Sequence, residues 1–337
     1  MSDRSNRNGE IDLMRFIFSI FIIIYHYPLK YLNIGVSGYF AVEFFFITSG
    51  VYFAKKMNAI QCSNKEIGFS FIVNKILNYY RFYIPALMLN LIYIVIYEWQ
   101  GLSDFVYRLF ISIPQFTFLD MLGFNVLRYN TIIYVGASWY LSATLLTYII
   151  LIPIISYSLK DFTTKIAPFI IIISISFLYK YYGKLSALHD FTVGFIDGGL
   201  IRSICEVSLG CVCFEIGEKI KNKNSKNSKI MTLIEVVIIT IVIFYMCGYR
   251  DPITELPMLL LLSVAIIIAY SETSNLQLIR NCNIINYLGK LSFPLYVFHR
   301  IVASFFEKLN ITNHFLAYIV ICILLSATMM WALKKRS

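Results

Sequence analysis

Hydrophobic residues occur along this chain in long runs that are separated by short polar segments. A helix needs about 20 mostly apolar residues, within a range of roughly 17–25, to cross a lipid bilayer. Ten segments come close to this length, so the pattern predicts an all-α integral membrane protein, a bundle of about ten transmembrane helices. The predicted spans are residues 12–28, 36–54, 83–99, 132–156, 166–182, 199–217, 230–248, 256–270, 291–307 and 315–333.

Two segments depart from this simple pattern. Residues 256–270 form a short apolar run with Pro257 near its start, so a tilted, broken or partly inserted helix is expected there. Residues 102–120 carry charges and Pro114, and we expect them to lie at the membrane interface instead of crossing the bilayer.

The composition supports a membrane protein and excludes an ordinary soluble one. Of the 337 residues 58% are hydrophobic and 14% are charged, and the mean hydropathy is +0.71. Soluble domains hold roughly 45–50% apolar and about 25% charged residues, so this chain has too little polar surface to cover a soluble fold.

The charge pattern predicts an orientation. Cytoplasmic loops of membrane proteins carry an excess of Lys and Arg, and with a cytoplasmic N-terminus most of the 29 Lys and Arg residues fall in inner segments. This rule also accounts for the net charge of +10, so no nucleic-acid partner is expected. We therefore predict one domain over residues 1–337, with cytoplasmic tails at 1–11 and 334–337. The seven cysteines lie mostly within or beside apolar runs without metal-like spacing, so no metal site is predicted.

Charged and polar residues within the apolar runs are the candidates for function, because a charge at the centre of a span costs about 2.5–3.5 kcal/mol. Arg15 and His26 are eleven positions apart in the first span. At 3.6 residues per turn this spacing puts them on one helix face, separated by roughly 16 Å along the axis. Two interpretations are open: each side chain simply reaches its nearer membrane surface, or the face they share is a functional polar stripe.

The second span contains Glu43, which in lipid must be paired or protonated. Arg15 is one candidate partner, and an acid–base role near a reacting hydroxyl is the alternative. In the sixth span Arg202 and Glu206 lie four residues apart and can pair along a helix. Towards the end, Ser292, Tyr296 and His299 follow helical spacing around Pro294.

Taken together, these stretches resemble the acyltransferase-3 family of membrane-bound O-acyltransferases. The family's hallmark is an arginine, ten residues and then a histidine in the first span, which Arg15 and His26 match. Six such motifs occur in the family's order over nearly the whole chain. The other five are Val42, Glu43, Phe44, Phe45 and Phe46 with Ser49 and Gly50; Lys75 and Arg81 with Pro85; Trp139, Tyr140 and Leu141; Arg202 with Gly210; and residues 288–299, LGKLSFPLYVFH.

The resemblance implies transfer of an acyl group, usually acetyl, from acyl-CoA to a hydroxyl of a cell-surface or lipid-linked glycan. Acetyl-CoA would be a co-substrate, with no permanently bound cofactor. The expected location is the bacterial inner (cytoplasmic) membrane. The expected partners are the lipid bilayer, acyl-CoA, the glycan acceptor and envelope-glycan assembly proteins.

The resemblance also implies roles for residues. His26 would be the general base or a transient acyl carrier, Arg15 would position the donor and stabilise charge, and Glu43 would orient one of them. Lys75 and Arg81, with Arg15, would bind the phosphates of acyl-CoA at the inner face. The residues expected to line the cavity are Ser49, Trp139, Tyr140, Arg202, Ser292, Tyr296 and His299.

One motif departs from the family pattern, which usually has clustered arginines shortly before a proline. Here Lys75 replaces an arginine and Pro85 follows Arg81 by four residues. Lysine binds phosphate as a point charge and not as a bidentate fork, so this departure affects the expected phosphate contacts.

Two other functions fit a polar ten-span bundle. A transporter or flippase of a lipid-linked glycan would favour repeated halves or matching broken helices, and neither is evident in the sequence. A glycan polymerase usually has a large outer loop, and the longest predicted outer segment, around residues 100–131, is short.

Overall fold

The computed structural model describes residues 8–27, 35–60, 65–122, 136, 138–187, 192–193, 196–221, 228–248, 251–276, 282–311 and 313–334. Parts of the predicted tails, residues 1–7 and 335–337, lie outside the described residues, as does the beginning of the predicted span 132–156.

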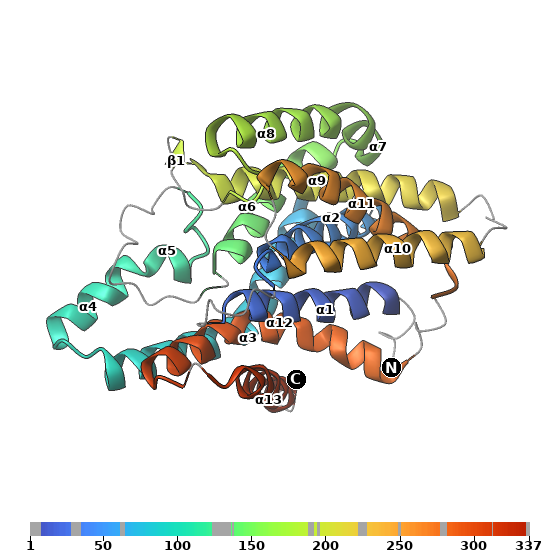
Figure 1. The fold of residues 1–337 in the computed structure, drawn as a ribbon. Helices are drawn as coiled ribbons and strands as arrows, with labels where there is room; N and C mark the ends of the chain where they lie inside the picture. Colours follow the sequence, from blue (N-terminus) through green and yellow to red (C-terminus); the bar gives the residue numbers. More distant parts are fainter. Residues whose placement is uncertain are drawn as a thin grey trace.

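Most of the described backbone is helical, as predicted, and the long helices lie side by side in a bundle (Figure 1). α8 lies at one edge of this view and α13 at the opposite edge. The long helices are α1 (Gly9–Tyr25), α2 (Ala41–Ile60), α3 (Lys65–Tyr97), α6 (Ser138–Ile155), α8 (Ala167–Tyr182), α9 (Gly198–Lys221), α10 (Ser228–Cys247), α11 (Glu255–Ser271), α12 (Asn283–Lys308) and α13 (Phe315–Lys334).

The remaining elements are short. Two-residue strands, β1 (Thr192–Val193) and β2 (Ile196–Asp197), pair antiparallel and are a small addition to the predicted all-α fold. The short helical elements are η1 (Gly38–Phe40), α4 (Leu102–Ile111), α5 (Ile113–Phe116), α7 (Leu159–Asp161), the π-helical η3 (Phe162–Ile166) and η4 (Pro252–Thr254).

Six helical segments within the described residues are long and apolar enough to cross a membrane. Several carry large apolar side chains that no other part of the described chain covers, such as Phe169, Phe244 and Leu316, which are 69%, 71% and 75% exposed. A lipid environment accounts for such surfaces, and the chain is a multi-pass membrane protein. The six segments are Phe69–Tyr97, Ser138–Ile155, Leu159–Tyr182, Ser228–Cys247, Pro252–Ser271 and Phe315–Leu333.

The four other long helices, α1, α2, α9 and α12, are not among these six segments, and α1 is only 17 residues long. Each has a charged residue within it, such as Arg15, Glu43, Arg202 or Lys290. They pack in pairs, α2 on α9 and α1 on α12, and their polar side chains are largely enclosed. The most polar helices therefore form the inside of the bundle, while the count of ten spans stays a prediction.

Two glycines allow α2 and α9 to approach closely. A Cβ atom at Gly50 would collide with the carbonyl oxygen of Val207, and one at Gly210 would collide with the carbonyl oxygen of Ile47. Small residues at such crossings let helix backbones touch within a membrane. This contact places the polar residues of the two helices directly opposite each other.

The structure corrects one predicted boundary. The third predicted span begins at residue 83, but α3 is continuous from Lys65 to Tyr97 and contains Pro85. Apolar residues before residue 83, among them Phe71 and Ile72, extend the buried face, and the proline interrupts only part of the backbone hydrogen bonding. Lys75 thus lies within a helix and not in a loop before it.

The possible break near Pro257 is absent from the described helix, while tilt and partial insertion stay a prediction. Asp251 accepts a hydrogen bond from the backbone N–H of Ile253 at 3.0 Å, and the chain continues through η4 into α11. Pro257 falls in the first turn of α11, where proline is tolerated because the N–H groups have no partner within the helix.

The segment predicted to lie at the interface forms the short helices α4 and α5. α4 exposes Leu102 and Phe110, each at 69%, and it stands at one end of the bundle in Figure 1. On its other face Arg108 is buried and binds Asp104 at 2.7 Å and Glu98 at 3.0 Å. This two-sided helix is too short to cross a bilayer.

Candidate active site

α1 carries the polar stripe that its sequence spacing predicts. Its first turn is capped by Asn8, whose side-chain oxygen accepts hydrogen bonds from the N–H groups of Glu10 and Ile11 at 3.0 and 3.2 Å. At the other end His26 is the capping residue, two positions before Pro28. Arg15 lines one cavity and His26 lines a second one.

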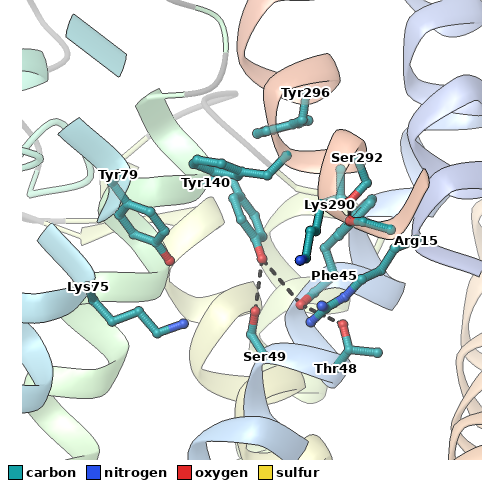
Figure 2. A pocket seen from close by; sticks show the side chains of 13 residues that line it. Arg15, Phe45, Thr48, Ser49, Lys75, Tyr79, Tyr140, Lys290, Ser292 and Tyr296 are labelled. Carbon is teal, nitrogen blue, oxygen red and sulfur yellow. Dashed lines mark hydrogen bonds between the residues drawn. The ribbon is translucent and has the colours of Figure 1, made fainter. Parts of the chain in front are cut away.

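The first of these, the inner cavity, has a volume of about 290 Å³. Three cationic side chains reach it: Arg15 from α1, Lys75 from α3 and Lys290 from α12. Figure 2 shows their charged ends pointing toward the interior of the cavity. Its lining residues are Arg15, Val42, Phe45, Thr48, Ser49, Lys75, Tyr79, Tyr140, Gly289, Lys290, Ser292, Phe293 and Tyr296.

The inner cavity suits an anion. No acidic side chain occurs among the described residues that line it. The guanidinium of Arg15 lies 3.7 Å from the carboxylate of Asp12 and stacks 4.9 Å from the centre of the Tyr52 ring. Lys75 lies against the rings of Phe71 and Tyr148, each at 5.8 Å. Three cations in a partly enclosed space would hold phosphate groups tightly.

Hydroxyl groups line part of the inner cavity. The hydroxyls of Ser49 and Tyr140 are hydrogen-bonded at 3.0 Å, and the Tyr140 hydroxyl also donates to the carbonyl of Phe45 at 3.2 Å (Figure 2). Tyr148 donates to the carbonyl of Ser49 at 3.3 Å. These bonds tie α6 to α2 and fix the cavity wall.

The second cavity, the outer cavity, has a volume of about 340 Å³. Val42 and Tyr296 line both cavities, so the two spaces are adjacent at this pair of side chains. The Tyr296 ring packs 5.4 Å from the ring of Tyr140 and 5.9 Å from that of His299. Its lining residues are Ile22, Tyr25, His26, Tyr39, Val42, Gly136, Trp139, Lys184, Ser186, Arg202, Pro252, Glu255, Tyr296 and His299.

Two imidazoles stand together in the outer cavity. The rings of His26 and His299 are 4.8 Å apart at an angle of 55°. Nδ1 of His26 lies 2.9 Å from the carbonyl oxygen of Ile22, and Nδ1 of His299 lies 2.7 Å from that of Tyr296. A neutral His26 therefore carries its proton on Nδ1 and keeps the lone pair of Nε2 available as a base.

A family comparison bears on this arrangement. The model of the acyltransferase-3 family, an acyltransferase domain, matches residues 8–335. The chain belongs to this acyltransferase family. No curated protein and no solved structure matched the chain in the other two comparisons.

The acyltransferase brings most of the predicted site residues together. Arg15, Ser49, Lys75, Tyr140 and Ser292 line the inner cavity. His26, Trp139, Arg202 and His299 line the outer one, and Tyr296 lines both.

Arg81 is an exception, because it does not line the described part of either cavity. Its side chain is exposed and donates to the carbonyl of Leu333 in α13 at 2.7 Å. Lys75 precedes it by six residues on the same helix, which turns the two side chains to different faces.

Glu43 pairs with Arg202, which corrects the suggested partner Arg15. The guanidinium of Arg202 lies 2.6 and 2.8 Å from the two carboxylate oxygens of Glu43. It also lies 3.3 Å from Glu206, the pair that the i,i+4 spacing predicts. The close crossing at Gly50 and Gly210 explains why α2 and α9, and not α1, supply this pair.

The Glu43–Arg202 pair forms part of the wall of the outer cavity. Arg202 lines the cavity and stacks 5.8 Å from Trp139, while Glu43 lies behind it. Glu43 therefore orients Arg202, and its carboxylate is not among the described groups that face either cavity.

Sequence reasoning missed several residues of the site, among them Lys290 and Glu255. Lys290 lies inside the LGKLS stretch, but the motif did not mark it as a cavity residue. Glu255 lines the outer cavity and accepts hydrogen bonds from the Tyr39 hydroxyl at 3.0 Å and the Ser186 hydroxyl at 2.7 Å. The N–H groups of Leu185 and Ser186 also donate to it, at 2.7 and 3.0 Å. The sequence signal available for Glu255 was that its carboxylate lies next to an apolar run.

Proposed function

We propose that this acyltransferase moves an acyl group, with acetyl as the expected one, from acyl-CoA to a hydroxyl of a cell-surface or lipid-linked glycan. One observation carries the proposal: a cationic cavity and a cavity with two imidazoles are adjacent at Val42 and Tyr296. A donor that is anionic at one end and reactive at the other fits such a pair of spaces.

The inner cavity would hold the phosphates of the donor. Arg15, Lys75 and Lys290 come from three helices, so the cluster forms only in the folded bundle. Arg15 and His26 are roughly 16 Å apart along the axis of α1. Arg15 would therefore position the charged part of the donor, and the thin pantetheine arm would carry the thioester past Tyr296 toward His26.

His26 would act as the general base in the outer cavity. The acceptor hydroxyl attacks the thioester carbon, and its proton passes to Nε2 of His26. The C–O bond of the new ester forms first, the C–S bond breaks when the tetrahedral intermediate collapses, and the proton then goes from His26 to the thiolate to give free CoA. Arg202 lines the wall of the same cavity, where Glu43 and Glu206 hold its guanidinium in place.

The acceptor and the location belong to the same proposal. Tyr39, Trp139, Lys184 and Ser186 give the outer cavity the polar and aromatic lining that suits a sugar. With the predicted orientation this cavity opens toward the outside, so a glycan at the outer face of a bacterial inner membrane would be the acceptor. Envelope-glycan assembly proteins would supply or remove it.

The test uses the purified protein in detergent with radiolabelled acetyl-CoA and a crude lipid-linked glycan fraction. His26→Ala should abolish acyl transfer, and Arg15→Ala should weaken binding of acetyl-CoA. His314→Ala is the matched control, because His314 is exposed at the start of α13 and lines neither cavity among the described residues.

Each outcome separates the alternatives. Label that stays on the protein after denaturation and disappears in His26→Ala would make His26 an acyl carrier and not a base. Transfer by His26→Ala at the wild-type rate would remove His26 from the mechanism. A folded protein that binds and transfers no acyl-CoA from a panel of donors would refute the proposal and favour a glycan transporter.

A further inference from the structure

The two histidines of the outer cavity are held in the same way. In each ring Nδ1 lies within hydrogen-bonding distance of a backbone carbonyl oxygen one turn earlier, at 2.9 Å for His26 and 2.7 Å for His299. A carbonyl oxygen can only accept, so Nδ1 carries the proton in both neutral rings. Each Nε2 is then a hydrogen-bond acceptor, and two such acceptors share one cavity.

One of these two acceptors is buried without a donor. His299 is 1% exposed, and its Nε2 has no hydrogen-bond partner among the described residues. Several donors of the wall already have acceptors within the protein: Tyr39 and Ser186 donate to Glu255, and Arg202 binds Glu43 and Glu206. A buried acceptor without a donor is unfavourable, so the complementary ligand must bring donors of its own.

We propose that the outer cavity recognises two hydroxyl groups on adjacent carbons of the acceptor, a vicinal diol of a sugar ring. One hydroxyl donates to Nε2 of His26 and is acylated, and its neighbour donates to Nε2 of His299 and stays free. The spacing of the two histidines supports this proposal. The ring centres of His26 and His299 are 4.8 Å apart, which allows each of two neighbouring hydroxyls to reach one Nε2 atom. The inference rests on the proposed acyl transfer and names its substrate class.

The chemical step leaves His299 unchanged. The proton of the attacking hydroxyl goes to His26 and then to the departing thiolate, as in the proposed reaction. His299 only accepts a hydrogen bond and makes no covalent bond. It is therefore a binding residue that orients the acceptor, and the product is a monoester with a free hydroxyl beside it.

The test measures acetyl transfer from acetyl-CoA to probes of sugar-ring size. cis-1,2-Cyclohexanediol presents both hydroxyls, cis-2-methoxycyclohexanol replaces one donor by an ether, and cyclohexanol lacks it. After correction for the diol's two reactive hydroxyls, the wild-type protein should prefer the diol to either comparator by about tenfold or more, as expected when a buried acceptor loses its donor.

Variants show whether His299 causes the preference. In His299→Leu the diol-to-ether ratio should fall to about one after the same correction, because a hydrocarbon accepts no hydrogen bond. His299→Gln keeps an acceptor oxygen near the position of Nε2 and should restore part of the ratio. His314→Leu is the matched control and should leave the ratio unchanged. Gel filtration and circular dichroism check the fold of each variant.

Three results would overturn the inference. Equal transfer to the diol and its comparators by the wild-type protein would show that only one hydroxyl is recognised. An unchanged preference in His299→Leu, or an equal fall for all probes, would mean that His299 holds a water molecule or supports the wall. Transfer to cyclohexanol would still sustain the proposed function in these cases, whereas no transfer to any probe or glycan would end both.

Discussion

The buried cluster of Glu43, Arg202 and Glu206 makes a sharp stability prediction. One guanidinium faces two carboxylates, and the three side chains are 1–3% exposed. Glu43 makes the better contacts, at 2.6 and 2.8 Å, and Glu206 makes a single one at 3.3 Å. If all three groups are ionised, the cluster carries a net charge of −1. Removing each member therefore has a different consequence.

Arg202→Met leaves two buried carboxylates without a cation and should lower the free energy of unfolding by about 3–5 kcal/mol. Glu43→Gln leaves a neutral but poorly aligned pair and should cost about 1–3 kcal/mol. Glu206→Gln leaves the closer ion pair of Glu43 and Arg202 and should cost less than either, or stabilise the protein. The loss in the free energy of unfolding should therefore be largest for Arg202→Met, smaller for Glu43→Gln and smallest for Glu206→Gln.

The assay is unfolding in mixtures of SDS and mild detergent, followed by circular dichroism, with acyl transfer measured on the same preparations. Combining Arg202→Met with Glu43→Gln should recover part of the loss, because the double variant contains one buried charge fewer than Arg202→Met. Equal costs for Arg202→Met and Glu206→Gln would refute this assignment of charge. No recovery in the double variant would do the same.

Three further predictions concern other parts of the site. Gly50→Ala should lower the free energy of unfolding by about 1–3 kcal/mol, because the new methyl group meets the backbone of α9 and forces the helices apart; SDS unfolding measures this loss. Lys290→Met should raise the Kd for CoA about 3–10-fold at low salt and less at high salt, as measured by calorimetry. Lys165→Met is its control, at a lysine 74% exposed in a surface ion pair, and an equal effect there would contradict the phosphate assignment. Glu255→Gln should reduce transfer to glycans more than hydrolysis of acetyl-CoA, because the wall around Ser186 loses its anchor; an unchanged ratio of the two would exclude that role.

Sequence alone determined the kind of protein and most of its helices. Long apolar runs can be covered only by lipid or by each other, so their presence predicts a membrane bundle before any contact is known. The motif pattern, read as a resemblance, led to the acyltransferase family, which the match over residues 8–335 confirms. Continuous helix through Pro85 was not predicted, because the proline and the nearby charges looked like a boundary.

Helical spacing also predicted which residues of one helix share a face. Arg15 and His26 line adjacent cavities, and Arg202 and Glu206 are paired, because both relations depend only on the helix period.

Partners on different helices were decided only by the tertiary structure. Glu43 meets Arg202 and not Arg15 because two glycines bring α2 against α9. Arg81 turns away from the cavity, while Lys290 and Glu255 enter the site from α12 and α11. His26 follows α1 and His299 lies in α12, so the short distance between their rings likewise depends on how these two helices pack. Such contacts depend on how helices pack in space, which the period of a single helix does not contain.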